Sequence, residues 1–263
     1  MFAGAVVWLT VQKKAPKPQA PAAPESSRVE SSAPSSEKPA RSAKAELLAR
    51  PTPPEKLKAP PKPEPKVKDL GQGRYRVGAV TFDEKARTIV IPASVHMREG
   101  AVEYILVSKH GKAHEAVFVT DADARDVHLA ALLLGMKPEP DLGPAESAAK
   151  IGDHGAVEAW VEWDRNGPPA RVPLNETVAL ADPESGQTTG TLPAGLWLYN
   201  GSEVAANGVF VASASGSIIS IIRDPEALVN NPGATRDNDE IHTPNPKKLP
   251  KLQHPVRIVL KVR

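Results

Sequence analysis

The stretch GKAHEAVFVTDADARDVHLAALLLG, from Gly111 to Gly135, contains a strand pattern followed directly by a helix pattern. Its first half is predicted to be the second strand of a hairpin that turns at residues 110–111. Asp123 is a good N-cap for the apolar run that follows, and Gly135 stands where a helix often ends in left-handed backbone. The stretch therefore predicts a strand and then the main helix of the domain, over about residues 124–134.

Alternating apolar residues on both sides of this helix predict antiparallel hairpins. Their turns are expected at residues 83–86, 110–111, where a glycine supplies positive φ, and 164–167. Further strands are expected within residues 195–202, 208–224 and 256–262. The third hairpin should bury the face formed by Val157, Ala159, Val161 and Trp163.

A short second helix is predicted over about residues 225–229, because Asp224 precedes Pro225 as an N-cap precedes a first-turn proline. We therefore expect residues 70–263 to form one strand-rich α+β domain of antiparallel hairpins with one main helix.

The N-terminal quarter of the chain has a different composition. Residues 13–68 contain 13 of the 28 prolines, no aromatic residue, and 13 basic against 6 acidic residues, a net charge of +7. Such a segment has too few apolar side chains to offset the entropy of folding. We predict a disordered, partly polyproline II spacer over residues 13–69. The remaining residues, 69–263, carry a net charge of −5, since the whole chain carries +2.

The apolar run from Phe2 to Val11 spans 10 residues, whereas a membrane helix needs about 20. We interpret residues 1–12 as the remnant of a signal or anchor segment, which predicts an extracytoplasmic location and a membrane contact through this segment. The chain has no cysteine, so disulfides, zinc–thiolate sites and thiol nucleophiles are excluded. Nucleic acid is not expected as a partner, because glutamates dilute the basic spacer and no aromatic residues interleave for base stacking.

Several segments together resemble the YdjY domain of bacterial envelope proteins. In chain order they are GKAHEAV, DVHLAALLLG, VEW, WLYNGS, GVFVASASGSIISIIRDPEALVNNPG and DEIHTPN, within roughly residues 75–263. The resemblance implies an extracytoplasmic, often tethered domain and implies no reaction. Ala116 stands where the family pattern suggests a small hydroxyl residue. If that hydroxyl matters, this chain lacks its chemistry.

His114, Glu115 and His128 are the first candidate functional residues. His114-Glu115 resembles the start of a zincin motif, but Phe118 occupies the position of the second histidine. With a turn at residues 110–111, His114 would lie opposite Val107 and Glu115 opposite Leu106 on apolar faces. A buried Glu115 needs a partner, and we expect a Lys or Arg from another strand, with a catalytic dyad as the alternative.

His128 is interpreted as a half-buried histidine with a hydrogen-bond partner. It would form a metal site with His114 and Glu115 if the helix packs on that hairpin. Weaker metal candidates lie in the loop RDNDEIH, whose spacing is not that of an EF-hand: Asp237, Asp239, Glu240 and His242. A solvated acidic loop is the simpler interpretation, and Asn230 and Asn231 are expected to act as turn or cap residues.

The complete constellation of a known catalytic site is missing, so the sequence favours a protein that is not an enzyme. The leading hypothesis is an envelope-tethered domain that binds an envelope protein or a cell-surface ligand outside the cytoplasm. A metal-dependent enzyme using His114, Glu115 and His128 is one alternative, and a purely structural domain is another. No cofactor is assigned. Trp163 is expected in the core, while Trp197 and Tyr199 fit either the core or an exposed recognition patch.

Overall fold

The computed structural model describes residues 66–139 and 151–263. The predicted signal or anchor remnant (1–12) and most of the predicted spacer (13–69) lie outside the described residues. The first described strand, β1 (Val67–Gly71), begins three residues before the predicted start of the domain and pairs with β2 (Arg74–Val77).

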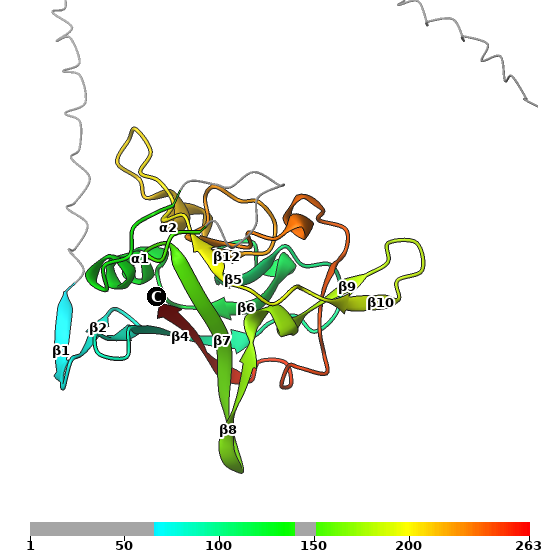
Figure 1. The fold of residues 1–263 in the computed structure, drawn as a ribbon, viewed down its shortest axis with the longest axis horizontal. Helices are drawn as coiled ribbons and strands as arrows, with labels where there is room; N and C mark the ends of the chain where they lie inside the picture. Colours follow the sequence, from blue (N-terminus) through cyan, green and yellow to red (C-terminus); the bar gives the residue numbers. More distant parts are fainter. Residues whose placement is uncertain (1–65, 140–150) are drawn as a thin grey trace, which may run out of the picture. The chain divides into compact units, whose positions relative to one another are not determined.

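Eight strands pair in a ring and form a closed β-barrel (Figure 1). In ring order they are β4 (Thr88–Val95), β15 (Pro255–Val262), β7 (Ala156–Arg165), β11 (Trp197–Tyr199), β13 (Val229–Asn230), β12 (Ser217–Ser220), β5 (Tyr104–Ser108) and β6 (Ala116–Thr120). Side chains fill the interior of a barrel of this size. Ile89, Phe118, Val161, Ile219 and Ile258 are completely buried in this core.

Strand β4 closes the ring because two different strands share one of its edges. Its first half pairs with β3 (Val80–Asp83), for example Thr81 with Val90, and its second half pairs with β6, where Ser94 lies opposite Val119. Pro92 lies between the two halves. The hydroxyl of Thr120 donates a 2.6 Å hydrogen bond to the Pro92 carbonyl oxygen and so holds β6 against β4.

The predicted α+β fold of antiparallel hairpins is wrong. The sheet is mixed: β5 and β6 are parallel, with Leu106 opposite Phe118, and β12 and β13 are parallel, with Ile219 opposite Val229. Within the described residues the α-helices are α1 (Ala124–Leu133) and the five-residue α2 (Val211–Ser215). Closing the ring requires pairs between strands that are far apart in sequence, and local alternation of apolar residues carries no information about such pairs.

The predicted hairpin at residues 110–111 does not form, although the chain does turn there, with the N–H of Gly111 donating a 2.8 Å hydrogen bond to the carbonyl of Ser108. Instead, residues 109–115 return along the strands as a short crossover that ends in the 3₁₀ helix η1 (Ala113–Glu115). Gly111 is needed there for close packing rather than for positive φ, since a Cβ at this position would lie 2.8 Å from the carbonyl oxygen of Ser215. The expected pairs of His114 with Val107 and of Glu115 with Leu106 are therefore also wrong.

The main helix is confirmed as α1, with the predicted caps. The side chain of Asp123 accepts a 2.9 Å hydrogen bond from the backbone N–H of Arg125, and Gly135 has φ of 82°. The helix packs against β2, β3 and β4. It therefore covers the place where the β1–β3 extension joins the barrel (Figure 1).

The hairpin of β3 and β4, the hairpin of β7 and β8 (Gly167–Pro173), and the closing strand β15 are confirmed. On the predicted face of β7, Val157, Val161 and Trp163 are buried and Ala159 is half-buried. Two other predictions are wrong. The first strand expected within residues 208–224 is the helix α2, which ends at Gly216 with φ of 76°, and the helix expected over residues 225–229 is a series of turns.

Long-range hydrogen bonds explain why residues 225–229 do not form a helix. Asp224 does cap this segment, since its carboxylate accepts a 2.9 Å hydrogen bond from the N–H of Glu226. However, the Leu228 carbonyl accepts hydrogen bonds of 2.9 and 3.1 Å from the N–H groups of Asn200 and Gly201. The backbone is thus drawn into the extended conformation of β13.

A second sheet has three strands in the order β10 (Thr188–Thr191), β9 (Val178–Ala181) and β14 (His242–Pro244). Trp163, Trp197 and Tyr199 are all buried, so they belong to the core and do not form an exposed recognition patch. In the described part of the chain, none of the helices has the length and apolar character that crossing a membrane requires.

Candidate functional site

Two glutamates meet where the parallel strands β5 and β6 begin. Glu103 directly precedes β5 and Glu115 directly precedes β6, so both lie at the same edge of the barrel. The backbone fixes them there. The N–H of Glu103 donates to the carbonyl of Glu115 at 2.9 Å, and the carbonyl of Glu103 accepts from the N–H of Ile221 at 2.8 Å.

The side chains of these two glutamates also contact each other. Burial and then the negative charge of Glu115 raise the pKa of Glu103, and a hydrogen bond between the two carboxyl groups acts in the same direction. Asp239 raises it further, while the ammonium group of Lys112 lowers it. We call Glu103, Glu115 and Asp239 the carboxylate cluster. Like charges held this close destabilise one another, which favours either a shared proton or a bound cation.

Lys112 lies beside this cluster but has another partner. Its Nζ donates a 2.6 Å hydrogen bond to the hydroxyl of Tyr104, which donates in turn to the carboxylate of Asp224 at 3.0 Å. Burial raises the pKa of Tyr104 to about 12. The hydrogen bond to Tyr104 is also the main cause that raises the pKa of Lys112. A protonated Lys112 therefore neutralises part of the negative charge of this edge.

His114 and Glu115 are neighbours in space as in sequence. The His114 Nε2 lies 3.4 Å from Oε1 of Glu115, and 77% of the His114 side chain is exposed. Within the described residues, the expected Lys or Arg from another strand does not form an ion pair with Glu115. The side chains that act on Glu115 are those of His114 and Glu103.

His128 lies elsewhere and has other partners. Its Nδ1 is 2.8 Å from the hydroxyl of Tyr199, and its ring packs 4.9 Å from the ring of Phe210. Burial lowers the pKa of His128. This environment agrees with the interpretation of a half-buried, hydrogen-bonded histidine. Among the residues described, no three or more His, Asp and Glu side chains are grouped so that they could hold a metal ion, and His114, Glu115 and His128 do not form such a group.

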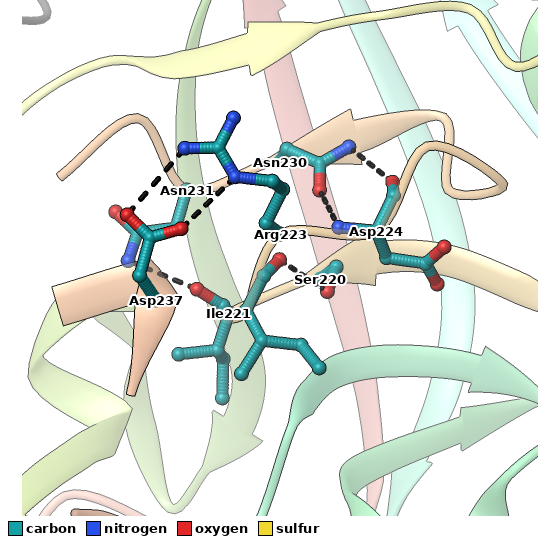
Figure 2. Close-up of polar contacts among 8 residues, drawn as sticks. Ser220, Ile221, Arg223, Asp224, Asn230, Asn231 and Asp237 are labelled. Carbon is teal, nitrogen blue, oxygen red and sulfur yellow. Dashed lines mark hydrogen bonds and ion pairs between the residues drawn. The ribbon is translucent and has the colours of Figure 1, made fainter. Parts of the chain in front are cut away.

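The segment that follows β12 shapes the rest of this edge (Figure 2). The amide of Asn230 accepts from the N–H of Asp224 at 3.0 Å and donates to its carbonyl at 2.9 Å, while Asn231 donates to the carbonyl of Ile221 at 3.0 Å. Both asparagines therefore fix turns, as predicted. They hold Asp224 in position to accept the hydrogen bond from Tyr104.

The acidic residues of the loop, Asp237, Asp239 and Glu240, are exposed to solvent, as predicted. Asp237 forms an ion pair with Arg223 at 2.9 Å (Figure 2), and that hydrogen bond is the main cause that lowers the pKa of Asp237. Arg236 is buried in the same loop. A depression of about 240 Å³ is lined by Ile222, Arg223, Arg236, Asp237 and Asp239.

The four weak metal candidates are separated by their surroundings. Asp239 and Glu240 are exposed, Asp237 is paired with Arg223, and His242 is completely buried in β14. Burial lowers the pKa of His242 to about 4, and neither ring nitrogen has a hydrogen-bond partner in the described part of the chain. The carbonyl of His242 accepts a 3.0 Å hydrogen bond from the N–H of Val102, which brings this loop beside Glu103.

Sequence reasoning found Glu115 and Asp239 but missed Glu103, Lys112 and the Tyr104–Asp224 pair. One signal was present, since Glu103 and Glu115 each directly precede an apolar strand. With antiparallel strands these positions would lie at opposite edges. Only the parallel pairing of β5 and β6 places them together.

Comparison with known proteins gives one match. The family model of the YdjY domain matches residues 80–261, which covers the barrel and the carboxylate cluster. No curated protein and no solved structure matches the chain. The match extends over more than half of the chain and agrees with the segments whose resemblance was noted in the sequence. The chain belongs to the YdjY domain family.

Proposed function

We propose that this protein is a non-catalytic binding domain that acts outside the cytoplasm and recognises a positively charged group of its partner at the carboxylate cluster. The observation that carries the proposal is the meeting of Glu103 and Glu115 at one edge of the barrel, where the N–H of Glu103 donates a 2.9 Å hydrogen bond to the Glu115 carbonyl and both side chains are half-buried. Two such groups in a half-buried position destabilise the fold at neutral pH, and functional sites are where proteins retain arrangements of this kind.

The chemistry of the cluster suits a cation. Ionised carboxylates are acceptors only, and they bind ammonium and guanidinium groups through charge-assisted hydrogen bonds. Asp239 adds a third carboxylate, and it lies on the exposed side of the cluster. A lysine, an arginine or a free amino group of a partner would neutralise the charge that Lys112 leaves unbalanced.

The surrounding groups support binding rather than catalysis. Lys112 and Tyr104 are engaged in a fixed hydrogen-bonded chain that ends at Asp224. Asn230 and Asn231 use their amides to hold turns. The cluster therefore offers a preorganised negative charge rather than an activated nucleophile.

The extracytoplasmic location and the envelope partner rest on the sequence. The apolar run at residues 2–11 and the proline- and lysine-rich segment that follows are typical of a domain held at a distance from a membrane. An envelope protein or a cell-surface ligand that presents a basic group is the partner that fits both the tether and the cluster.

The proposal is tested by titrating the full chain with N-acetyl-trilysine amide, followed by NMR. We expect the amide resonances of residues near Glu103, Glu115 and Asp239 to shift. A probe with every lysine side chain acetylated should cause no shift, because it lacks the charge. Glu115→Gln should weaken binding about tenfold, since it removes one charge-assisted hydrogen bond.

Glu184→Gln is the matched control, because Glu184 is exposed in the turn that follows Asp182 and lies outside the cluster. It should bind the probe as the unaltered chain does. Equal binding of the acetylated probe, or full binding by Glu115→Gln, would rule out the proposed site.

A further inference from the structure

A second candidate site lies on the hairpin of β7 and β8, which extends from the barrel (Figure 1). A cleft of about 490 Å³ opens there between the outer face of the hairpin, the 3₁₀ helix η3 (Leu174–Thr177) and the segment that leads into β11. Its lining combines charged and amide side chains with one indole ring and several small residues, and it includes Glu158, Trp160, Arg171, Asn175, Glu176 and Gly195.

The wall of this cleft is a guanidinium group stacked on an indole. Arg171 lies diagonally across the hairpin from Trp160, because Arg171 pairs with Glu162 and Pro173 pairs with Trp160. Its guanidinium carbon is 3.6 Å from the centre of the Trp160 ring. Stacking of this kind fixes the plane of an arginine and leaves its N–H edges pointing outward.

Those N–H groups have spare capacity. In the part of the chain that the structure describes, Arg171 makes no hydrogen bond, and its ionic neighbour is Glu162 at 4.0 Å. The carboxylate of Glu162 is already engaged, since it accepts a 2.6 Å hydrogen bond from the indole N–H of Trp160. The Arg171 side chain is 59% exposed, so an incoming group can reach it.

The other carboxylates of the cleft are already paired with basic side chains. Glu158 lies 3.3 Å from a nitrogen of Arg263, and Glu176 lies 2.5 Å from Nζ of Lys248. Their negative charge is therefore largely balanced. Arg171 is the cation of the cleft that still has hydrogen-bond donors to offer.

We infer that this cleft binds the terminal carboxylate of a short peptide. A carboxylate accepts two parallel hydrogen bonds from one guanidinium group, which gives both affinity and orientation. Asn175 provides an amide oxygen, its nitrogen being used on the carbonyl of Leu192 at 3.2 Å, so it can accept from a peptide N–H. Small apolar residues, Ala159 and Ala194, line the cleft and suit small side chains.

This site is independent of the carboxylate cluster, since it has different residues and the opposite charge preference. The experiment compares N-acetyl-alanyl-alanine with its C-terminal amide on the full chain. Binding is followed through the indole N–H resonance of Trp160 and the side-chain N–H resonances of Arg171. We expect the free acid to shift these resonances and the amide to leave them in place.

Two variants separate recognition from folding. Arg171→Ala should weaken binding of the free acid about tenfold or more. Gly195→Leu should fill part of the cleft without changing its charge. The fold should tolerate this substitution, because a Cβ at Gly195 meets no atom within 4 Å and the φ of Gly195 is not positive. Arg76→Ala, on the exposed strand β2, is the control and should bind normally.

Thermal unfolding of each variant shows whether it is folded. If Arg171→Ala does not fold, Gly195→Leu still tests whether the cleft is the binding site. Binding of the free acid that is lost in both variants and kept in Arg76→Ala would support the site. Equal binding of the acid and the amide, undiminished binding by a folded cleft variant, or no movement of the Trp160 resonance with either probe would overturn it.

Discussion

Glu103 holds its carboxyl group in a half-buried position against the carboxyl group of Glu115. Burial and the neighbouring charge raise the pKa of Glu103 in the folded protein. In an unfolded chain the pKa of a glutamate is about 4.3. The folded state therefore holds this proton more tightly. The stability that Glu103 contributes is fully present below the unfolded pKa and is lost as the pH rises through the raised pKa.

We predict that Glu103→Gln stabilises the protein near neutral pH. Glutamine keeps the size and hydrogen-bonding ability of the side chain but removes the repulsion with Glu115. Because the group is partly exposed, a rise of about 1–2 °C in the thermal midpoint is expected. The rise should disappear at about pH 3, well below the unfolded pKa, where Glu103 is protonated in either state. Glu184→Gln, with an exposed carboxylate, should show no such pH-dependent difference, and a lower midpoint for Glu103→Gln at neutral pH would contradict the prediction.

At the scale of single elements, Gly111 shows why the crossover between β5 and β6 was not foreseen. A glycine after a histidine between two apolar runs is a normal signal for a hairpin turn. In the structure the same glycine allows the crossover to touch the end of α2, where the carbonyl of Ser215 would lie 2.8 Å from a Cβ. The requirement comes from a segment about a hundred residues away, so the local sequence does not reveal it.

Gly111→Ala should therefore destabilise the protein by about 1–3 kcal/mol, because the added methyl group meets backbone atoms that cannot move independently. The free energy of unfolding from urea denaturation measures the effect. Gly190→Ala is the matched control, since nothing lies within 4 Å of a Cβ there and its φ is not positive. Similar losses in both variants would show that the close approach at Gly111 is not the cause.

The contact between α1 and β11 gives a second prediction for an element. The hydroxyl of Tyr199 and Nδ1 of His128 are 2.8 Å apart, and Tyr199 is buried. Tyr199→Phe removes the hydroxyl and leaves the imidazole nitrogen without its partner, which should lower the free energy of unfolding by about 1 kcal/mol. Urea denaturation measures this, and an unchanged value would show that His128 finds another partner.

The elements that the sequence predicted are those whose signals are local. The caps at Asp123 and Gly135 define α1, and alternation defines the β7–β8 hairpin and β15. Parallel pairing, ring closure at β4 and the meeting of Glu103 with Glu115 depend on contacts between distant segments. This is why Glu115 and Asp239 were found as separate candidates, whereas Glu103 and its contact with Glu115 were missed.

For the whole molecule, the position of β15 matters most. The last strand in sequence lies between β4 and β7, and it pairs with both along nearly its full length. Its residues Ile258 and Leu260 are buried in the barrel core. The ring therefore depends on residues 255–262, and the pairings that they make with β4 and β7 are far apart in sequence.

A chain that ends at His254 should accordingly lose the cooperative unfolding transition, because β4 and β7 then have unpaired inner edges and the core is open. Circular dichroism during thermal unfolding detects this change. A chain that lacks only Arg263 keeps β15 and should unfold cooperatively. Cooperative unfolding of the chain without β15 would mean that the barrel does not depend on ring closure.

The most direct test of the central claim, that the carboxylate cluster binds a cation, is the pH dependence of binding. Calorimetry of the full chain with N-acetyl-trilysine amide should show affinity that falls as the pH drops through the raised pKa of Glu103. In mildly acid solution, proton release should accompany binding, and Glu103→Gln should abolish that release. Binding that does not change with pH, or the same proton release in Glu103→Gln, would contradict the account.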